Sequence, residues 1–139
     1  MKRYMNASIL YAILAMVGGV FYREFTKLYG FIDRTSLGFV HTHYFLLGMV
    51  FFLLLLLLEK NFSFSGAKTS RILIFYHIGL NLTAVMLAVR GVTQVLGMVL
   101  PFSINATISG VAGIGHILLS VSLILLLLQI KRSLSDNIQ

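Results

Sequence analysis

The sequence predicts an all-α membrane protein with four transmembrane helices. Of its 139 residues, 58% are hydrophobic and 11% are charged, whereas soluble domains carry about 25% charged residues. The mean hydropathy is +0.94. Four apolar segments are each long enough to cross a bilayer core of about 30 Å, which takes about 20 helical residues. These runs are continuous and do not alternate with polar residues, so helices are expected rather than barrel strands.

The expected helices span about residues 4–22, 36–58, 71–89 and 107–130. They form a single domain over residues 1–139, because too few residues are left for a separate soluble domain. The first segment, MKRYMNASIL and onward, has the composition of a signal peptide. Three further spans follow it without a convincing small-residue cleavage motif, so we interpret it as a retained helix. Pro101, the one proline, is expected to turn the chain between the third and fourth helices.

The basic residues lie at the ends of the apolar segments and predict the topology. Seven fall on one side, namely Lys2, Arg3, Lys60, Lys68, Arg71, Lys131 and Arg132. Four fall on the other, namely Arg23, Lys27, Arg34 and Arg90. The positive-inside rule then places both termini in the cytoplasm. Although the net charge is +7, no basic stripe follows a helix face, so nucleic acid is not an expected partner.

Two histidines, His41 and His43, stand in the segment GFVHTHYFLLG at the start of the second expected helix. At about 1.5 Å per residue they lie roughly 8 to 10 Å below the outer end of that helix, and His116 lies about 13 Å below the outer end of the fourth. His77 is expected near the cytoplasmic end of the third helix, in a different layer. Ionisable residues inside a membrane are costly and often functional, so the three outer histidines form a candidate site.

Residues two apart on a helix point about 200° away from each other. His41 and His43 therefore cannot bind one metal ion together and are expected to serve two different neighbours. A zinc site would use spacings of three or four residues, as in H-E-x-x-H. The sequence has no cysteine, which excludes thiolate metal sites, disulfides and the c-type haem attachment motif.

A b-type haem matches these features. Haem needs one or two axial imidazoles, a flat apolar slot and cations for its propionates. The segment SGVAGIGH repeats small residues before His116, with Gly110 and Gly113 spaced three apart. The predicted iron ligands are His41, His43 and His116, with Gly113 in the slot and with Arg23 and Arg90 near the propionates.

A polar packing network explains the same residues without a cofactor. Small-residue stripes in membrane helices more often serve close helix packing, and single histidines often form hydrogen bonds between helices. A non-haem transporter or channel with histidines along a polar path, and a structural membrane subunit, are therefore the alternatives. For His77 a structural role is expected, with Asn81 and Thr83 as interhelical hydrogen-bond partners.

The segment VHTHYFLLGMVF resembles the tenth helix of the catalytic subunit of the haem–copper oxidases, which has the form V-x-H-x-H-Y; here it is Val40-His41-Thr42-His43-Tyr44. The resemblance implies that His41 ligates one haem and His43 a neighbouring low-spin haem. No further histidine pair completes a copper centre, so copper and oxygen reduction are not expected, while electron transfer or gas binding is. The whole sequence is also similar to a small uncharacterised family of four-span bacterial membrane proteins through its REFTK, HxH, VRGVTQVLG and ISGVAGIGH segments. This resemblance implies that the chain is a multi-pass protein of the inner membrane of a bacterial cell.

A homotrimer is the expected assembly. The oxidase subunit has twelve helices in three arcs of four, so the resemblance implies three copies of a four-helix chain. A two-fold dimer repeats one contact on both subunits and would leave one histidine of each His-x-His pair unused. In a ring, each cleft receives His41 from one protomer and His43 from the next. Alternatively, His116 replaces one of these ligands and places each haem within a single protomer.

Overall fold

The described residues of the computed structural model, 1–136, form four long helical segments. The elements are α1 (Lys2–Leu28), α2 (Leu37–His43), the π-helical segment η1 (Tyr44–Val50), α3 (Phe51–Phe62), α4 (Ala67–Val95) and α5 (Phe102–Asp136). α2, η1 and α3 follow one another without a break and make one membrane-length helix, Leu37–Phe62. All four segments are long and apolar enough to cross a membrane, which confirms the predicted all-α class and the number of spans.

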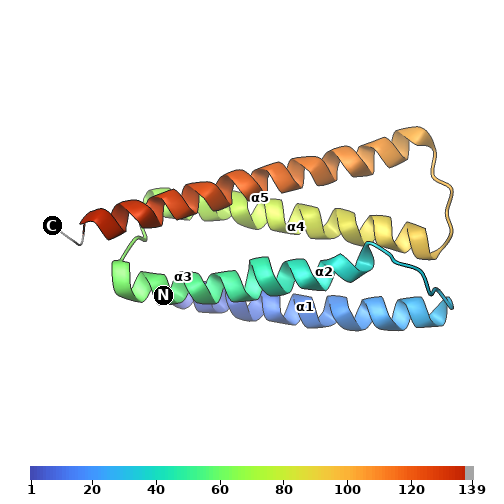
Figure 1. Cartoon of the computed structure of the whole chain (residues 1–139), viewed down its shortest axis with the longest axis horizontal. Helices are drawn as coiled ribbons and strands as arrows, with labels where there is room; N and C mark the ends of the chain where they lie inside the picture. Colours follow the sequence, from blue (N-terminus) through green and yellow to red (C-terminus); the bar gives the residue numbers. More distant parts are fainter. Residues whose placement is uncertain (137–139) are drawn as a thin grey trace.

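The helices run up and down as an elongated bundle (Figure 1). We call the end that carries the start of α1, the connection between α3 and α4 and the last turns of α5 the near end. The far end carries the loops 29–36 and 96–101. The seven basic residues that the sequence assigns to one side of the membrane lie at the near end, and the other four lie at the far end.

Each helix is longer than the apolar segment that predicted it. α4 runs from Ala67 to Val95 and α5 from Phe102 to Asp136, whereas the sequence predicted 71–89 and 107–130. The added turns include polar and charged residues. For this reason the hydropathy of the sequence did not mark them as part of the spans. The turn after α4 contains Gly97 at φ +61°, a conformation that favours glycine, and Pro101 directly precedes α5, as predicted.

The π-helical segment η1 was not predicted. Its wide turns leave main-chain carbonyls without regular helical partners, and side chains from neighbouring helices bind two of them. Tyr76 donates to the Leu47 carbonyl at 2.7 Å, and Ser8 donates to the Met49 carbonyl at 3.0 Å. A carbonyl inside a membrane needs such a partner, so these two contacts stabilise the π-helical geometry in the middle of the second span.

The buried core lies mainly in the near half of the bundle. Tyr4, Tyr11 and Ala15 of α1 are buried there together with Phe52 of α3 and Tyr76 of α4. The far half of α5 is different: within residues 102–116, all of which the structure describes, Ile108 and Gly115 alone are buried. The near half therefore buries more of its own side chains than the far half, where a face of α5 is left open.

Candidate functional site

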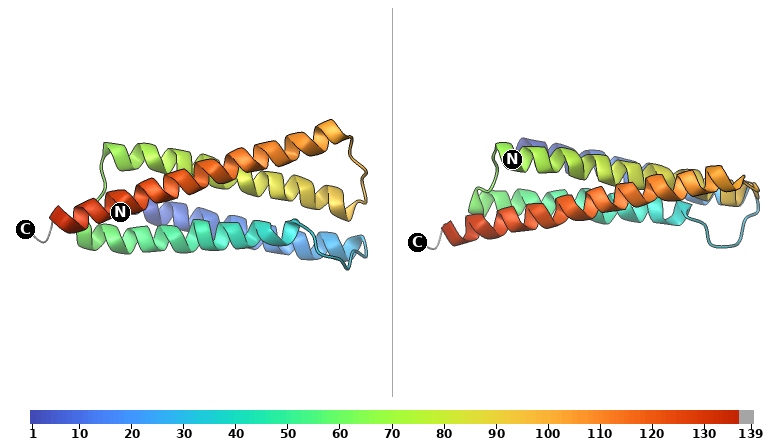
Figure 2. Two further views of the ribbon diagram at one scale, coloured as in Figure 1. Left: turned by 45° about the horizontal axis from the view of Figure 1, so that its top comes forward. Right: turned by 90° about the horizontal axis from the view of Figure 1, so that it is seen from above.

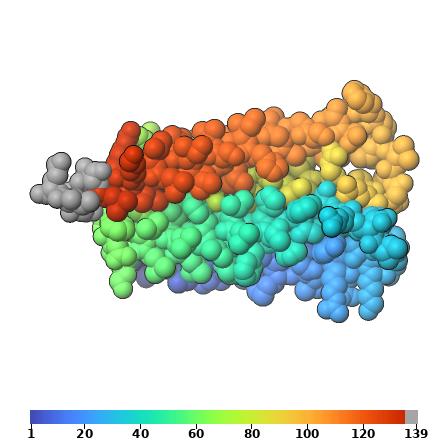
Figure 3. All heavy atoms as spheres, in the orientation of Figure 1, coloured from blue at the N-terminus to red at the C-terminus, as the bar shows by residue number. Residues whose placement is uncertain are grey.

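His43 at the end of α2 and His116 in α5 come together in the far half of the bundle. Their ring centroids are 6.1 Å apart and their ring planes are inclined by 87°. On the surface in Figure 3 the orange far half of α5 borders the teal helix that contains α2 and η1. The structure thus confirms the prediction that His43 and His116 share one layer.

Both imidazoles are oriented by the same kind of hydrogen bond. Nδ1 of His43 lies 2.7 Å from the Phe39 carbonyl, and Nδ1 of His116 lies 2.8 Å from the Ala112 carbonyl. Since a carbonyl oxygen accepts, Nδ1–H donates in each case. The neutral ring then carries its lone pair on Nε2, which is how metal-ligating histidines are commonly held.

The separation of the two rings matches a pair of axial ligands. Two imidazoles that bind one metal ion through Nε2, with metal–nitrogen distances of about 2 Å, have ring centroids roughly 6 Å apart. Among the residues that the structure describes, no group of three or more His, Asp or Glu side chains converges on a metal position. A haem takes at most two ligands from the protein, because the porphyrin supplies four nitrogens, so the number of imidazoles in this pair is compatible with haem.

The small residues of α5 fall into two sets. Gly115 meets α4 closely: a Cβ atom there would lie 2.7 Å from Thr83 Oγ1 and 2.9 Å from Thr83 N. Added Cβ atoms at Gly110 and Gly113 would meet nothing within 4 Å. Helix packing within the chain therefore explains Gly115, but it leaves Gly110 and Gly113 free on the face that precedes His116.

The open face continues onto the second span. A shallow groove of about 230 Å³ is lined by Thr42, His43, Leu46 and Leu47. Its walls are mainly apolar, and His116 and Gly113 are exposed on the facing helix. This surface is mainly apolar and lies beside two imidazoles, two of the properties that a porphyrin slot requires.

His41 faces the opposite side of its helix, as its spacing from His43 predicts. Its ring stacks on Tyr22 of α1, with centroids 6.4 Å apart and planes inclined by 11°, and a Cβ atom at Gly19 would lie 3.7 Å from its Cβ. His41 Nδ1 is buried without a hydrogen-bond partner among the described residues. The structure does not bring His41 into the cluster of His43 and His116.

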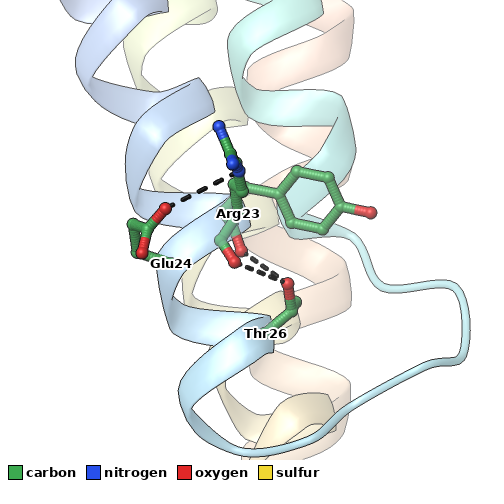
Figure 4. Close-up of polar contacts among 4 residues, drawn as sticks. Arg23, Glu24 and Thr26 are labelled. Carbon is green, nitrogen blue, oxygen red and sulfur yellow. Dashed lines mark hydrogen bonds and ion pairs between the residues drawn. The ribbon is translucent and has the colours of Figure 1, made fainter.

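The two predicted arginines have different surroundings. Arg90 Nη2 donates to Ser109 Oγ at 2.7 Å, which places the guanidinium on α5 about one turn from Gly113. The contacts of Arg23 stay within α1: its Nε lies 3.7 Å from Glu24 Oε1, and its carbonyl accepts from Thr26 (Figure 4). Its side chain is 80% exposed. Only Arg90 of this pair has a contact on the face that carries Gly113 and His116.

His77 belongs to a separate cluster in the near half. Tyr11 forms a hydrogen bond with His77 Nδ1 at 2.6 Å and accepts from Asn81 Nδ2 at 3.1 Å, while Tyr44 donates to Asn81 Oδ1 at 3.1 Å. The His77 ring stacks on Phe52 at a centroid distance of 4.8 Å and on Tyr11 at 5.6 Å. The predicted interhelical role of Asn81 is confirmed.

The prediction that Thr83 forms a hydrogen bond between helices is wrong. Its hydroxyl oxygen is buried without a hydrogen-bond partner among the described residues. Thr83 instead packs against the backbone of α5 at Gly115, where the close approach of two helices leaves no space for a polar partner.

The tyrosines of the near-half cluster were missed by sequence reasoning. Tyr11, Tyr44 and Tyr76 are each buried, with hydroxyl groups bonded to other helices. The signal in the sequence was the presence of tyrosines well inside apolar segments, where a buried hydroxyl needs a partner. Gly48 was a second signal, because a Cβ atom there would lie 2.5 Å from the Tyr11 Cβ.

Four membrane-length helices, polar groups directed into the bundle and apolar outer faces define a multi-pass membrane protein of the lipid bilayer. Within that class the chain belongs to the family described as "Protein of unknown function (DUF2871)", which matches residues 1–133. No curated protein and no solved structure matches the chain. The family description names no function, so the resemblance of the His-x-His segment to the haem–copper oxidases stays a prediction from the sequence.

Proposed function

We propose that this protein is a membrane-bound b-type haem protein that transfers electrons, with His43 and His116 of one chain as the axial ligands. The observation that carries the proposal is the pair of imidazoles 6.1 Å apart, each with Nδ1 held by a main-chain carbonyl. The open glycine face of α5 supports the same site. Of the two arrangements left open by the sequence, this geometry favours His116 over a neighbour's His41 as the partner of His43.

The chain's own residues define what such a site does. Bound haem would supply a one-electron couple, whose potential the protein sets through axial ligands and burial. His43 and His116 would occupy both axial positions, which favours electron transfer over gas binding. Arg90, held by Ser109, would offset the negative charge of a propionate at the far end.

The proposal includes a homotrimer with both termini in the cytoplasm of a bacterial cell. The His43–His116 face is open on one side, since His116 and Gly113 are exposed in the single chain. A neighbouring protomer would cover this face and exclude lipid from the haem. Native mass spectrometry in detergent measures the assembly. We expect a trimer with up to one haem per chain. A monomer that retains full haem would contradict the proposal that a neighbouring protomer covers the haem.

The cofactor itself is tested by the visible spectrum of detergent-purified protein. We expect a Soret band that shifts on addition of dithionite, and a pyridine haemochrome of the b type. The expression host should be supplied with a haem precursor, so that a deficit of haem cannot explain a colourless sample. A colourless protein that also fails to bind added hemin would refute the proposal.

The second candidate is a non-haem polar path, and the near-half cluster favours it. The chain of Tyr44, Asn81, Tyr11 and His77 connects three helices inside the membrane. His77 also lines a cavity of about 220 Å³ shared with Arg3 and Ser70 at the near end. If the protein provides such a polar path, His77→Ala should abolish proton or solute flux into proteoliposomes and leave any haem spectrum unchanged. Flux that is equal in wild type and variant would eliminate this candidate.

A further inference from the structure

A second groove lies between α4 and α5 at the near end, on a different surface from the histidine pair. It has a volume of about 210 Å³ and is lined by Lys68, Arg71, Ile72, Phe75, Leu118, Val121, Ser122 and Leu125. Leu118 and Leu125 are two and nine residues from His116, which places them on the opposite side of α5. The groove is therefore independent of the proposed haem site.

The crossing of the two helices creates this groove. α4 and α5 touch backbone to backbone where Gly79 meets Gly115 and Leu119: a Cβ atom at Gly79 would lie 2.6 Å from Leu119 N and 3.0 Å from the Gly115 carbonyl oxygen. From this contact the helices separate toward the near end, as both views in Figure 2 show for the green start of α4 and the red end of α5. The space between the two helices therefore opens to the surroundings of the bundle.

The walls of the groove are apolar and its mouth is cationic. Phe75, Val121 and Leu125 are half exposed along it, and the hydroxyl of buried Ser122 is already bonded to the Leu118 carbonyl at 2.6 Å. Lys68 and Arg71 stand at the near-end opening, and neither side chain has an ion pair or hydrogen bond with another described residue. Lys68 and Phe75 are seven residues apart, so the groove runs about 10 Å along α4.

We propose that this groove binds one anionic phospholipid, with an acyl chain between α4 and α5 and the phosphate against Lys68 and Arg71. Basic pockets between transmembrane helices are suited to anionic headgroups. The chemistry of the groove favours this occupant, because apolar walls suit an acyl chain and the side chains of Lys68 and Arg71 complement the negative charge of a phosphate.

Native mass spectrometry tests the proposal with dioleoyl phosphatidylglycerol and dioleoyl phosphatidylcholine, which differ only in the headgroup. The wild-type protein should retain the anionic lipid at least five-fold better. Lys68→Gln/Arg71→Gln should lose that preference, while Lys2→Gln/Lys60→Gln, which removes the same charge from the same end, should keep it. Val121→Phe fills the groove at an exposed position and should reduce retention of both lipids.

Three results would overturn the proposal. Equal retention of the two lipids by the wild-type protein would show no headgroup recognition. An equal loss of preference in the control variant would mean general attraction to a positive surface. Competition by millimolar inorganic phosphate without any effect of Val121→Phe would mean that the cations bind phosphate alone. None of these outcomes depends on haem, so they leave the proposed function untouched.

Discussion

The two halves of the bundle use histidine in opposite ways. In the near half, His77 is fixed through Nδ1 by the Tyr11 hydroxyl and lies between the rings of Tyr11 and Phe52. In the far half, the hydrogen bonds of His43 and His116 to other described residues go to carbonyls of their own helices, beside an open glycine face. A histidine bonded across helices contributes to packing, whereas the unbonded pair of His43 and His116 is the site at which we propose a ligand. The comparison separates residues that hold the bundle from residues available to a ligand.

The largest expected effect concerns the side of the membrane on which each end lies. The chain has no cysteine, so single cysteines at Thr26 and Ser65 can be labelled in intact cells with an impermeant thiol reagent. Because basic residues are retained in the cytoplasm, we expect complete labelling at Thr26 near the far end and none at Ser65. Permeabilised cells, in which both positions should react, provide the control. Labelling of intact cells at Ser65 alone would invert the topology.

The next largest effect separates packing glycines from free ones. Gly115→Val should lower the stability of the protein by about 3 kcal/mol, at the upper end for overpacked sites, because its Cβ meets the backbone of α4 at Thr83. Gly113→Val should leave stability nearly unchanged and reduce haem content instead. Thermal unfolding in detergent, followed by circular dichroism, measures the first effect. If both variants melt alike, the division of the α5 glycines into two sets is wrong.

A smaller effect is expected in the near half. Tyr11→Phe removes the hydroxyl that accepts from Asn81 and forms a hydrogen bond with His77. Interhelical hydrogen bonds in membranes contribute about 0.6 kcal/mol on average, and unsatisfied partners add to the cost, so we expect a loss of about 1 kcal/mol. The same thermal assay measures it. A change in the haem spectrum of this variant would break the proposed separation of the two halves.

The smallest effect distinguishes the two arginines. Arg90→Gln should accelerate haem loss to apomyoglobin by roughly two- to five-fold, the range expected for a partly exposed charge pair of up to about 1 kcal/mol. Arg23→Gln is the matched control, since its guanidinium lies beside Glu24 on α1. Equal rates in the two variants would remove Arg90 from the site.

The sequence was sufficient for the features that depend on hydropathy and helical spacing. Four apolar runs predicted four spans, and the i, i+2 spacing predicted that His41 and His43 diverge, as they do toward Tyr22 and His116. The pairing of helices was not predictable in the same way, because it depends on which small residues meet. Gly115 and Gly113 have the same sequence pattern, but only Gly115 contacts α4.

The π-helical segment and the tyrosine cluster could not be predicted from the sequence for a similar reason. A π-helix has no hydropathy signature, and here it depends on two side-chain donors from other helices, Ser8 and Tyr76. Tyr11 and Asn81 are likewise far apart in the chain. Such contacts become visible only when the bundle is assembled.

The most direct test of the central claim is the low-spin haem signal in four single variants, measured by electron paramagnetic resonance and optical spectra of the oxidised protein. If His43 and His116 of one chain ligate one haem, His43→Ala and His116→Ala should each abolish the low-spin signal. His41→Ala and His77→Ala should retain it, and all four should keep the helical content of the wild type. Retention in His116→Ala together with loss in His41→Ala would contradict the account and place the haem between protomers.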